Sequence, residues 1–163
     1  MVATNPAPDL VLTPINGPGQ TLTGWLTMFD LVLVALDPFT YESAWIIDTA
    51  ARVLTVYDQA DCRVAWLVAG APDEARLFLG PWAGEILTFA DPERSAIKTF
   101  VLEHLPAIVH DGMGGEVVDA AEGWDPPGWR RLTEELSRRM SWTKPVIPGP
   151  HDPAPFPGSP AVA

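Results

Sequence analysis

The chain has 163 residues, 47% of them hydrophobic and 19% charged, and this composition is typical of a globular domain with a buried core. The net charge of −11 argues against nucleic acid and anionic membranes as partners, because binding phosphate requires clustered Lys and Arg. No apolar run approaches ~20 residues, so no membrane insertion is expected. The opening "MVATNPAPDL" has no signal-peptide pattern. One cysteine, Cys62, excludes an internal disulfide and favours a cytoplasmic location.

The chain divides into three expected parts. Residues 1–20 read as an N-terminal extension with a short strand at 10–13 and a Gly-rich turn. Residues 21–140 read as the folded domain. Residues 141–163 hold seven prolines in 23 positions, which predicts an extended tail without a core of its own.

Within the domain, the apolar run "FDLVLVAL" at 29–36 predicts a strand that is covered on both faces. Helical spacing follows at 42–57, and a second buried strand is expected at 63–70, so the three segments predict a βαβ unit. The later expected elements are a short helix ending at Gly80, a strand at 85–90, a helix opened by Asp91 and Pro92, a hairpin at 107–120 and a helix at 127–139.

This order of elements resembles the thioredoxin fold from about residue 9 to residue 139, and within it the peroxiredoxin (alkyl hydroperoxide reductase) branch. "LVLVALDPFTYES" is similar to the strand and Pro…Thr-x-x-Cys loop of that branch, with Pro38 and Thr40 on the matching Pro and Thr. Ser43 falls where the reactive cysteine would be, and Pro106 falls on the position of a cis-proline. The resemblance implies an α/β three-layer sandwich, with a central mixed sheet flanked by helices.

The missing sulfur limits the chemistry that the resemblance implies. A cysteine at a helix N-terminus has its pKa lowered, and its thiolate attacks peroxides or disulfides. A serine hydroxyl at position 43 has no such redox chemistry, so we expect no enzyme activity through this turn. The alternative is a thiol oxidoreductase that uses Cys62, although the sequence places Cys62 on the opposite side of the sheet and next to Asp61.

Three other kinds of site stay open at this stage. Ser43 could act as a hydrolytic nucleophile if His104 approached it. The three histidines have no metal-ligand spacing, so neither a metal nor a cofactor is expected. A small ligand could lie between Ser43 and Pro106; the aromatic candidates to line such a cleft are Trp25, Phe39 and Tyr41.

The leading hypothesis is a redox-inactive protein that binds another protein as an accessory subunit, adaptor or assembly factor. The absent cysteine, the seven tryptophans and the proline-rich tail all favour it. The sequence also leaves open whether the chain forms a homodimer. The basic cluster on the last helix reads either as a solvated face or as a docking patch for an acidic partner. The candidate partner-binding residues are Trp124, Trp129, Arg130, Arg131, Trp142 and Phe156.

Overall fold

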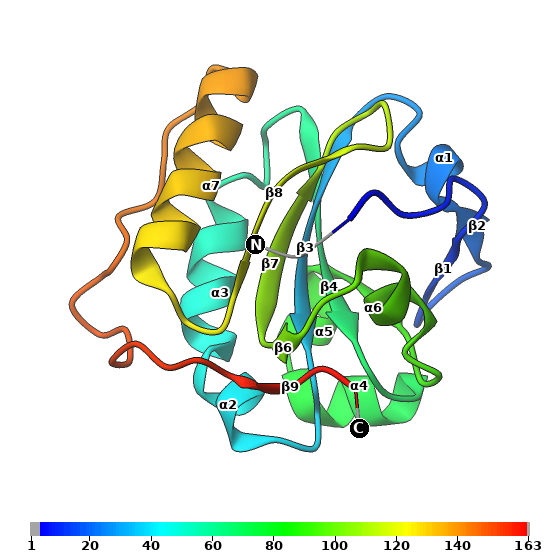
Figure 1. Ribbon diagram of the computed structural model, residues 1–163, viewed down its shortest axis with the longest axis horizontal. Coiled ribbons are helices and arrows are strands. Elements are labelled where there is room, and N and C mark those ends of the chain that lie inside the picture. The colour runs from blue at the N-terminus through cyan, green and yellow to red at the C-terminus, as the bar shows by residue number, and fades with distance from the viewer. Residues whose placement is uncertain (1–3, 163) are drawn as a thin grey trace.

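A seven-stranded mixed sheet forms the centre of the molecule, in the order β2-β1-β5-β4-β3-β7-β8 (Figure 1). The structure is a computed structural model that describes residues 4–162, so the outermost residues of the expected extension and tail, 1–3 and 163, lie outside it. Strands β3, β4 and β5 are parallel, β7 pairs antiparallel with β3, and β8 pairs antiparallel with β7. The strands are β1 (Val11–Pro14), β2 (Gln20–Thr21), β3 (Asp30–Leu36), β4 (Cys62–Val68), β5 (Leu87–Ala90), β6 (His104–Leu105), β7 (Ala107–Asp111), β8 (Val117–Glu122) and β9 (Ser159–Pro160).

Strand β3 is the central element that positions the site. All seven of its residues are buried, because its Leu and Val side chains meet apolar partners on both faces of the sheet. It pairs in parallel with β4, from Asp30 opposite Cys62 to Leu36 opposite Val68. The segment that follows Leu36 and the residues around Asp30 therefore lie at opposite ends of the sheet.

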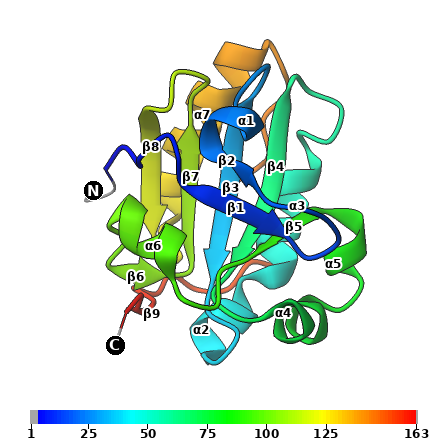
Figure 2. The ribbon, with the colours of Figure 1, turned by 90° about the vertical axis from the view of Figure 1, so that its right-hand side faces the viewer.

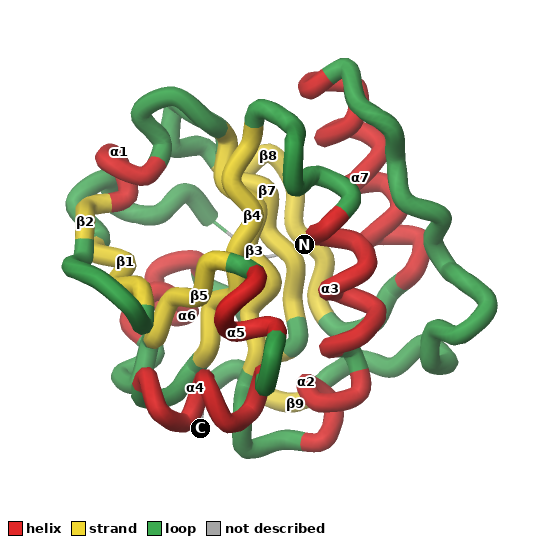
Figure 3. The backbone as a smooth tube through the Cα atoms, turned by 180° about the vertical axis from the view of Figure 1, so that it is seen from behind, coloured by secondary structure: helices red, strands yellow, loops and turns green. Residues whose placement is uncertain are grey.

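Helices cover both faces of this sheet and give three layers, as predicted (Figures 1 and 3). Helices α3 and α7 pack on one face with β3 residues such as Val32 and Val34, while α1 and α6 pack on the other with Leu31 and Leu33 (Figure 2). None of the described helices is both long and apolar enough to cross a bilayer. The helices are α1 (Leu22–Trp25), α2 (Tyr41–Trp45), α3 (Ile47–Thr55), α4 (Pro72–Leu79), α5 (Trp82–Glu85), α6 (Ser95–Phe100) and α7 (Pro126–Met140).

Two helix boundaries differ from the prediction. The expected helix at 42–57 is two helices, α2 and α3, which meet at the fully buried Ile46. The helix expected to open at Asp91 begins instead at Ser95, because Arg94 takes a positive φ of 57° and interrupts the turn before it. The carboxylate of Asp91 still accepts the N–H groups of Ala96 and Ile97, so it caps the helix from further upstream.

The tail (residues 141–163) does not project from the domain. It runs down the side of α7 and crosses the lower edge of the view in Figure 1 to reach β6. Ile147 is buried in the core between sheet and helices, and Asp152 bonds Thr49 and Arg52 of α3 at 2.8 and 2.7 Å. Strand β9 pairs antiparallel with β6. The tail is extended, as predicted, and its described part packs along the domain of its own chain.

Candidate functional site

The turn between β3 and α2 fixes Ser43 with hydrogen bonds. Ser43 lies in the first turn of α2, its side chain is fully buried, and its Oγ accepts the backbone N–H of Asp37 at 2.9 Å. The Asp37 carboxylate accepts the N–H of Phe39 and pairs with Arg94, both at 2.9 Å. Thr40 occupies the N-cap position, but its hydroxyl donates to the Asp37 carbonyl and does not cap the helix. The Ser43 hydroxyl is thus a buried structural acceptor.

Pro106 stands at the other side of this end of the sheet, between β6 and β7. The Leu105–Pro106 peptide bond is cis, as the resemblance to the thioredoxin fold implies, and the Pro106 carbonyl accepts the N–H of Gly123 at 2.7 Å. The ring of His104 contacts Glu122 at 3.3 Å. No hydrogen bond joins Ser43 to His104 among the described residues, so the serine-nucleophile arrangement is not assembled.

The tail lies along the strand that leads into Pro106. Beyond the β6–β9 pairing, the N–H of Ala161 donates to the Glu103 carbonyl at 2.8 Å. Phe156 packs edge-on against Trp45 of α2, with ring centroids 5.5 Å apart, and forms a backbone bridge with Trp124. The residues around Ser43 and Pro106 are therefore partly covered by the chain's own C-terminal segment.

The tryptophans expected at a partner surface are mostly interior. Trp124 and Trp129 are 1% and 0% exposed and pack against each other in the core, so their assignment as surface contacts is wrong. Their indole N–H groups donate to the Pro153 and Gly123 carbonyls. Trp142 is 39% exposed and donates to the Val56 carbonyl, so it holds the start of the tail.

The basic cluster on α7 is used within the chain. Arg130 donates to the Ile147 carbonyl of the tail at 2.9 Å, and Arg131 forms a two-pronged pair with Asp119 at 2.8 and 3.1 Å. Arg138 pairs with Glu135 on the same helix. These internal partners remove the basis for a docking patch that takes an acidic partner.

Cys62 lies at the start of β4, at the opposite end of the sheet from Ser43. Burial, helped by the carboxylates of Asp30 and Asp61, raises the pKa of the Cys62 thiol to about 12. A thiol with this pKa is protonated near neutrality, and the thiolate is the reactive form. The surroundings of Cys62 are the reverse of those that activate a cysteine.

The aromatic residues proposed to line a ligand cleft separate into two places. Trp25 is buried against Phe89, and its indole N–H donates to the Leu12 carbonyl, so its assignment to the cleft is wrong. Phe39 and Tyr41 do line a hollow of about 290 Å³ beside α2, together with Phe78 of α4. An adjoining hollow of about 280 Å³ is shared by Phe39, Phe78 and Leu77.

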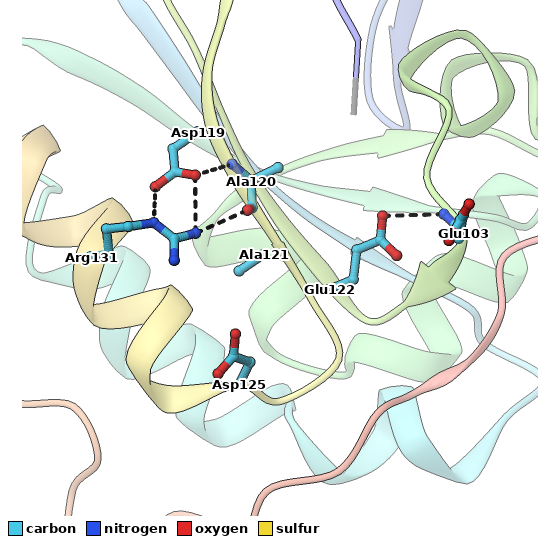
Figure 4. Close-up of a pocket in the computed structure, with 7 residues that line it drawn as sticks. All are labelled: Glu103, Asp119, Ala120, Ala121, Glu122, Asp125 and Arg131. Atoms are coloured by element: carbon cyan, nitrogen blue, oxygen red, sulfur yellow. Dashed lines mark hydrogen bonds and ion pairs between the residues drawn. The ribbon is translucent and has the colours of Figure 1, made fainter. Parts of the chain in front are cut away.

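A larger, acidic cavity of about 520 Å³ lies between β8 and the start of α7 (Figure 4). Glu122, Asp125 and Asp119 line it with Glu103, and Arg131 is tied to Asp119 at its rim. Glu103, His104 and Glu122 also bring three potential metal ligands within 4.8 Å of one another. The Glu122 carboxylate already accepts the backbone N–H groups of Glu103 and His104, at 3.2 and 3.1 Å, so it anchors the start of β6.

The amino end of β3 carries a buried polar cluster that the sequence did not reveal. His110 Nε2 lies 2.7 Å from Asp30 Oδ2, both side chains are at most 2% exposed, and Arg139 contacts the same carboxylate at 3.2 Å. Burial outweighs the bond to Asp30 and lowers the pKa of His110. Asp111 is fully buried with neither carboxyl oxygen hydrogen-bonded, and burial, with Glu116 and Asp30 nearby, raises its pKa to about 8. The sequence signal that could have indicated this cluster is an aspartate at one end of each of two apolar strands, Asp30 at the start of β3 and Asp111 at the end of β7.

Solved structures share this architecture. A thiol:disulfide interchange protein, DsbE, from Chlorobium tepidum matches with a TM-score of 0.69 at 15% identity, over 85% of this chain and 97% of that one. The chain has a thioredoxin-like fold. Peroxiredoxin Q of Xanthomonas campestris matches at 0.63 and 15% identity, over 82% and 92% of the two chains. A hypothetical protein from Sinorhizobium meliloti matches at 0.70 and 13% identity, over 99% and 94%. No model of a known family and no curated protein matches the sequence.

Proposed function

We propose that this thioredoxin-like protein is a redox-inactive member of the peroxiredoxin-like branch that binds another protein, as an accessory subunit, adaptor or assembly factor. The observation that carries the proposal is the buried hydroxyl of Ser43 at the start of α2, where it accepts the N–H of Asp37. An oxygen in this position holds the turn together and offers neither a thiolate nor a sulfenic acid.

The environment of Cys62 supports the same proposal. Its thiol is next to two carboxylates, it lies at the far end of the sheet, and its pKa is about 12. The alternative function, a thiol oxidoreductase that uses Cys62, would need a thiolate near neutral pH. A single cysteine also suits a reducing compartment, and we place the protein in the cytoplasm as part of this proposal.

Exposed apolar side chains beside α2 supply a surface for a partner. Phe39, Tyr41 and Trp45 are 65%, 79% and 55% exposed, and Leu77 of α4 is 88% exposed. Large apolar side chains gathered on one face are typical of an interaction site. We therefore assign the partner-binding role to this surface in place of Trp124 and Trp129.

Two measurements test the proposal together. The full-length chain, purified from its native host at moderate salt, is expected to bring a second protein in a fixed ratio. Peroxide and disulfide turnover by the wild-type chain are expected to equal those of the Cys62→Ser variant. Recovery of only monomer or homodimer would count against the proposal. Peroxide or disulfide turnover by the wild-type chain that disappears in Cys62→Ser would instead support the alternative function, a thiol oxidoreductase.

A further inference from the structure

An exposed aromatic patch spans α2 and α4 at the carboxyl end of β3. We define the aromatic patch as Phe39, Tyr41, Trp45, Leu77 and Phe78. Tyr41 and Trp45 are one helical turn apart on α2, so they share one side of that helix. Phe39 and Phe78 line both hollows, of about 280 and 290 Å³, which makes the patch continuous from one helix to the other. The hollows are open to solvent and give large apolar side chains a place to insert.

The charge around the patch is negative. Glu42 lies on α2, and Asp73 and Glu74 lie in the first turn of α4. Arg76 is the cation of α4, and it is bound to Asp73 and to the Ile15 carbonyl. No residue of α2 is basic. A partner that carries Lys or Arg beside its apolar anchors would complement this rim.

The backbone of the patch restricts how a partner can bind. Strand addition requires an unpaired strand edge, whereas the patch lies on two helices and on the turn before α2 that carries Phe39. We therefore expect apolar side chains to make most of the contact. An amphipathic helix that lies in a groove presents apolar anchors at i, i+3, i+4 and i+7, and basic residues can flank this stripe.

A second copy of the chain is a poor occupant. Each copy has a formal net charge of −11, and two facing patches would bring their acidic rims together. Like charges placed opposite each other at an interface disfavour association. The same rim disfavours an anionic membrane surface.

We propose that the aromatic patch docks a basic amphipathic helix of a partner protein. This inference rests on the proposed binding function and adds the location and chemistry of the contact. It assigns Phe39 and Phe78 to the walls of the groove and Tyr41, Trp45 and Leu77 to its exposed rim. Glu42 is assigned to the pairing with partner Lys or Arg, together with Glu74, whose other role is to accept the Ala71 N–H at 2.8 Å.

The test uses the full-length chain and a defined probe. The probe is a peptide of about 18 residues, roughly five helical turns, with Leu at a and d positions and Lys elsewhere. A matched peptide carries Glu in place of Lys. Isothermal titration calorimetry is expected to show binding of the Lys peptide, while the Glu peptide does not bind. The double variant Tyr41→Ser/Leu77→Ser is expected to weaken binding by about tenfold or more.

The control variant is Met28→Ser, since Met28 is 71% exposed in the segment before the amino end of β3. It is expected to bind the Lys peptide within about twofold of wild type, because an exposed residue outside the interface contributes little. Circular dichroism of each variant checks that the fold is retained. Equal binding of the Lys peptide by wild type, the control and the patch variant would overturn the inference, because it would mean general attraction between opposite charges.

Two further results would also overturn it. One is wild-type dimerisation in analytical ultracentrifugation that the patch variant abolishes, because a second copy would then be the occupant. The other is stronger binding to the Glu peptide. The proposed function survives these failures if the native complex still forms with the patch variant, and it fails by itself if no native complex exists or if Cys62 supports turnover.

Discussion

The two ends of β3 differ in how their buried polar groups are paired. At the carboxyl end, Asp37 has an arginine partner and Ser43 accepts a backbone N–H, so each buried polar group is paired. At the amino end, Cys62 lies among carboxylates, and Asp111 has no hydrogen-bond partner. The carboxyl end has an oxygen at the helix start, and the amino end has the sulfur in surroundings that suppress the thiolate.

This difference shows that the helix start after β3 keeps its buried polar groups paired with an oxygen, and no sulfur, at position 43. The helix start after β3 is held by hydrogen bonds that require an acceptor at position 43, which serine supplies. The same turn leaves Phe39, Tyr41 and Trp45 exposed. The start of α2 therefore combines a buried, hydrogen-bonded hydroxyl with three exposed aromatic side chains.

The largest expected effect concerns Asp111 at the amino end. Its folded-state pKa of about 8 lies above the ordinary value of 3.8, so between these pH values the folded state holds a proton that the unfolded state releases. Raising the pH through this window therefore destabilises the fold by roughly 1.4 kcal/mol per unit from this group. The Asp111→Asn variant is expected to remove this slope and to exceed wild type in stability at pH 7.

Urea unfolding at pH 5, 6 and 7 measures this effect. The wild-type free energy of unfolding is expected to fall relative to that of the variant, by roughly 3 kcal/mol over the range. Asp119→Asn, which changes an 18% exposed carboxylate on the neighbouring strand, is the control for a general loss of charge. Parallel pH profiles for wild type and Asp111→Asn would contradict the buried, protonated carboxyl.

The next effect compares one arginine at each end. Arg94→Met leaves the 5% exposed Asp37 without its cation and is expected to cost about 2 to 3 kcal/mol. Arg139→Met is expected to cost about 1 kcal/mol, because Asp30 keeps its bonds to His110 and to the Met113 N–H. Chemical denaturation of the two variants ranks them. A larger loss of unfolding free energy for Arg139→Met than for Arg94→Met would contradict this ranking, because it would mean that the amino end depends more on its ion pair.

A smaller effect is expected for Ser43→Ala. The variant leaves the buried N–H of Asp37 without its acceptor and is expected to lose about 1 kcal/mol of stability. Ser95→Ala changes an exposed serine at the start of α6 and is expected to have almost no effect. Thermal unfolding of both variants makes the comparison. Equal stability for Ser43→Ala and wild type would show that the hydroxyl is not a structural acceptor.

The sequence predicted the elements whose patterns are local. The apolar run of β3 and the turn that follows it each lie within a few residues, and the structure has a strand and a turn in these places; the cis bond before Pro106 was implied by the resemblance to the thioredoxin fold. The local patterns located the strand and the turn, and the order of the elements, which resembles the thioredoxin fold, predicted the fold.

What the sequence missed depends on long-range contacts. The tail is rich in proline and shows no periodicity, yet Ile147 and Asp152 find partners on α3 and α7 that only the folded domain brings together. Likewise, Asp30, His110 and Arg139 come from three separate elements. Tryptophan number alone favoured a surface role, whereas the burial of Trp124 and Trp129 is set by the packing of α7 on the sheet.

The most direct test compares the acidity of thiols at the two ends. The alkylation rate of Cys62 in wild type, and of the new thiol in the Ser43→Cys/Cys62→Ser variant, is measured against pH. The rate at Cys62 is expected to keep rising beyond pH of about 10, while the thiol at position 43, near the Asp37 N–H and the start of α2, titrates at lower pH. A plateau for Cys62 near neutral pH, with peroxide consumed by the wild-type chain, would contradict the account.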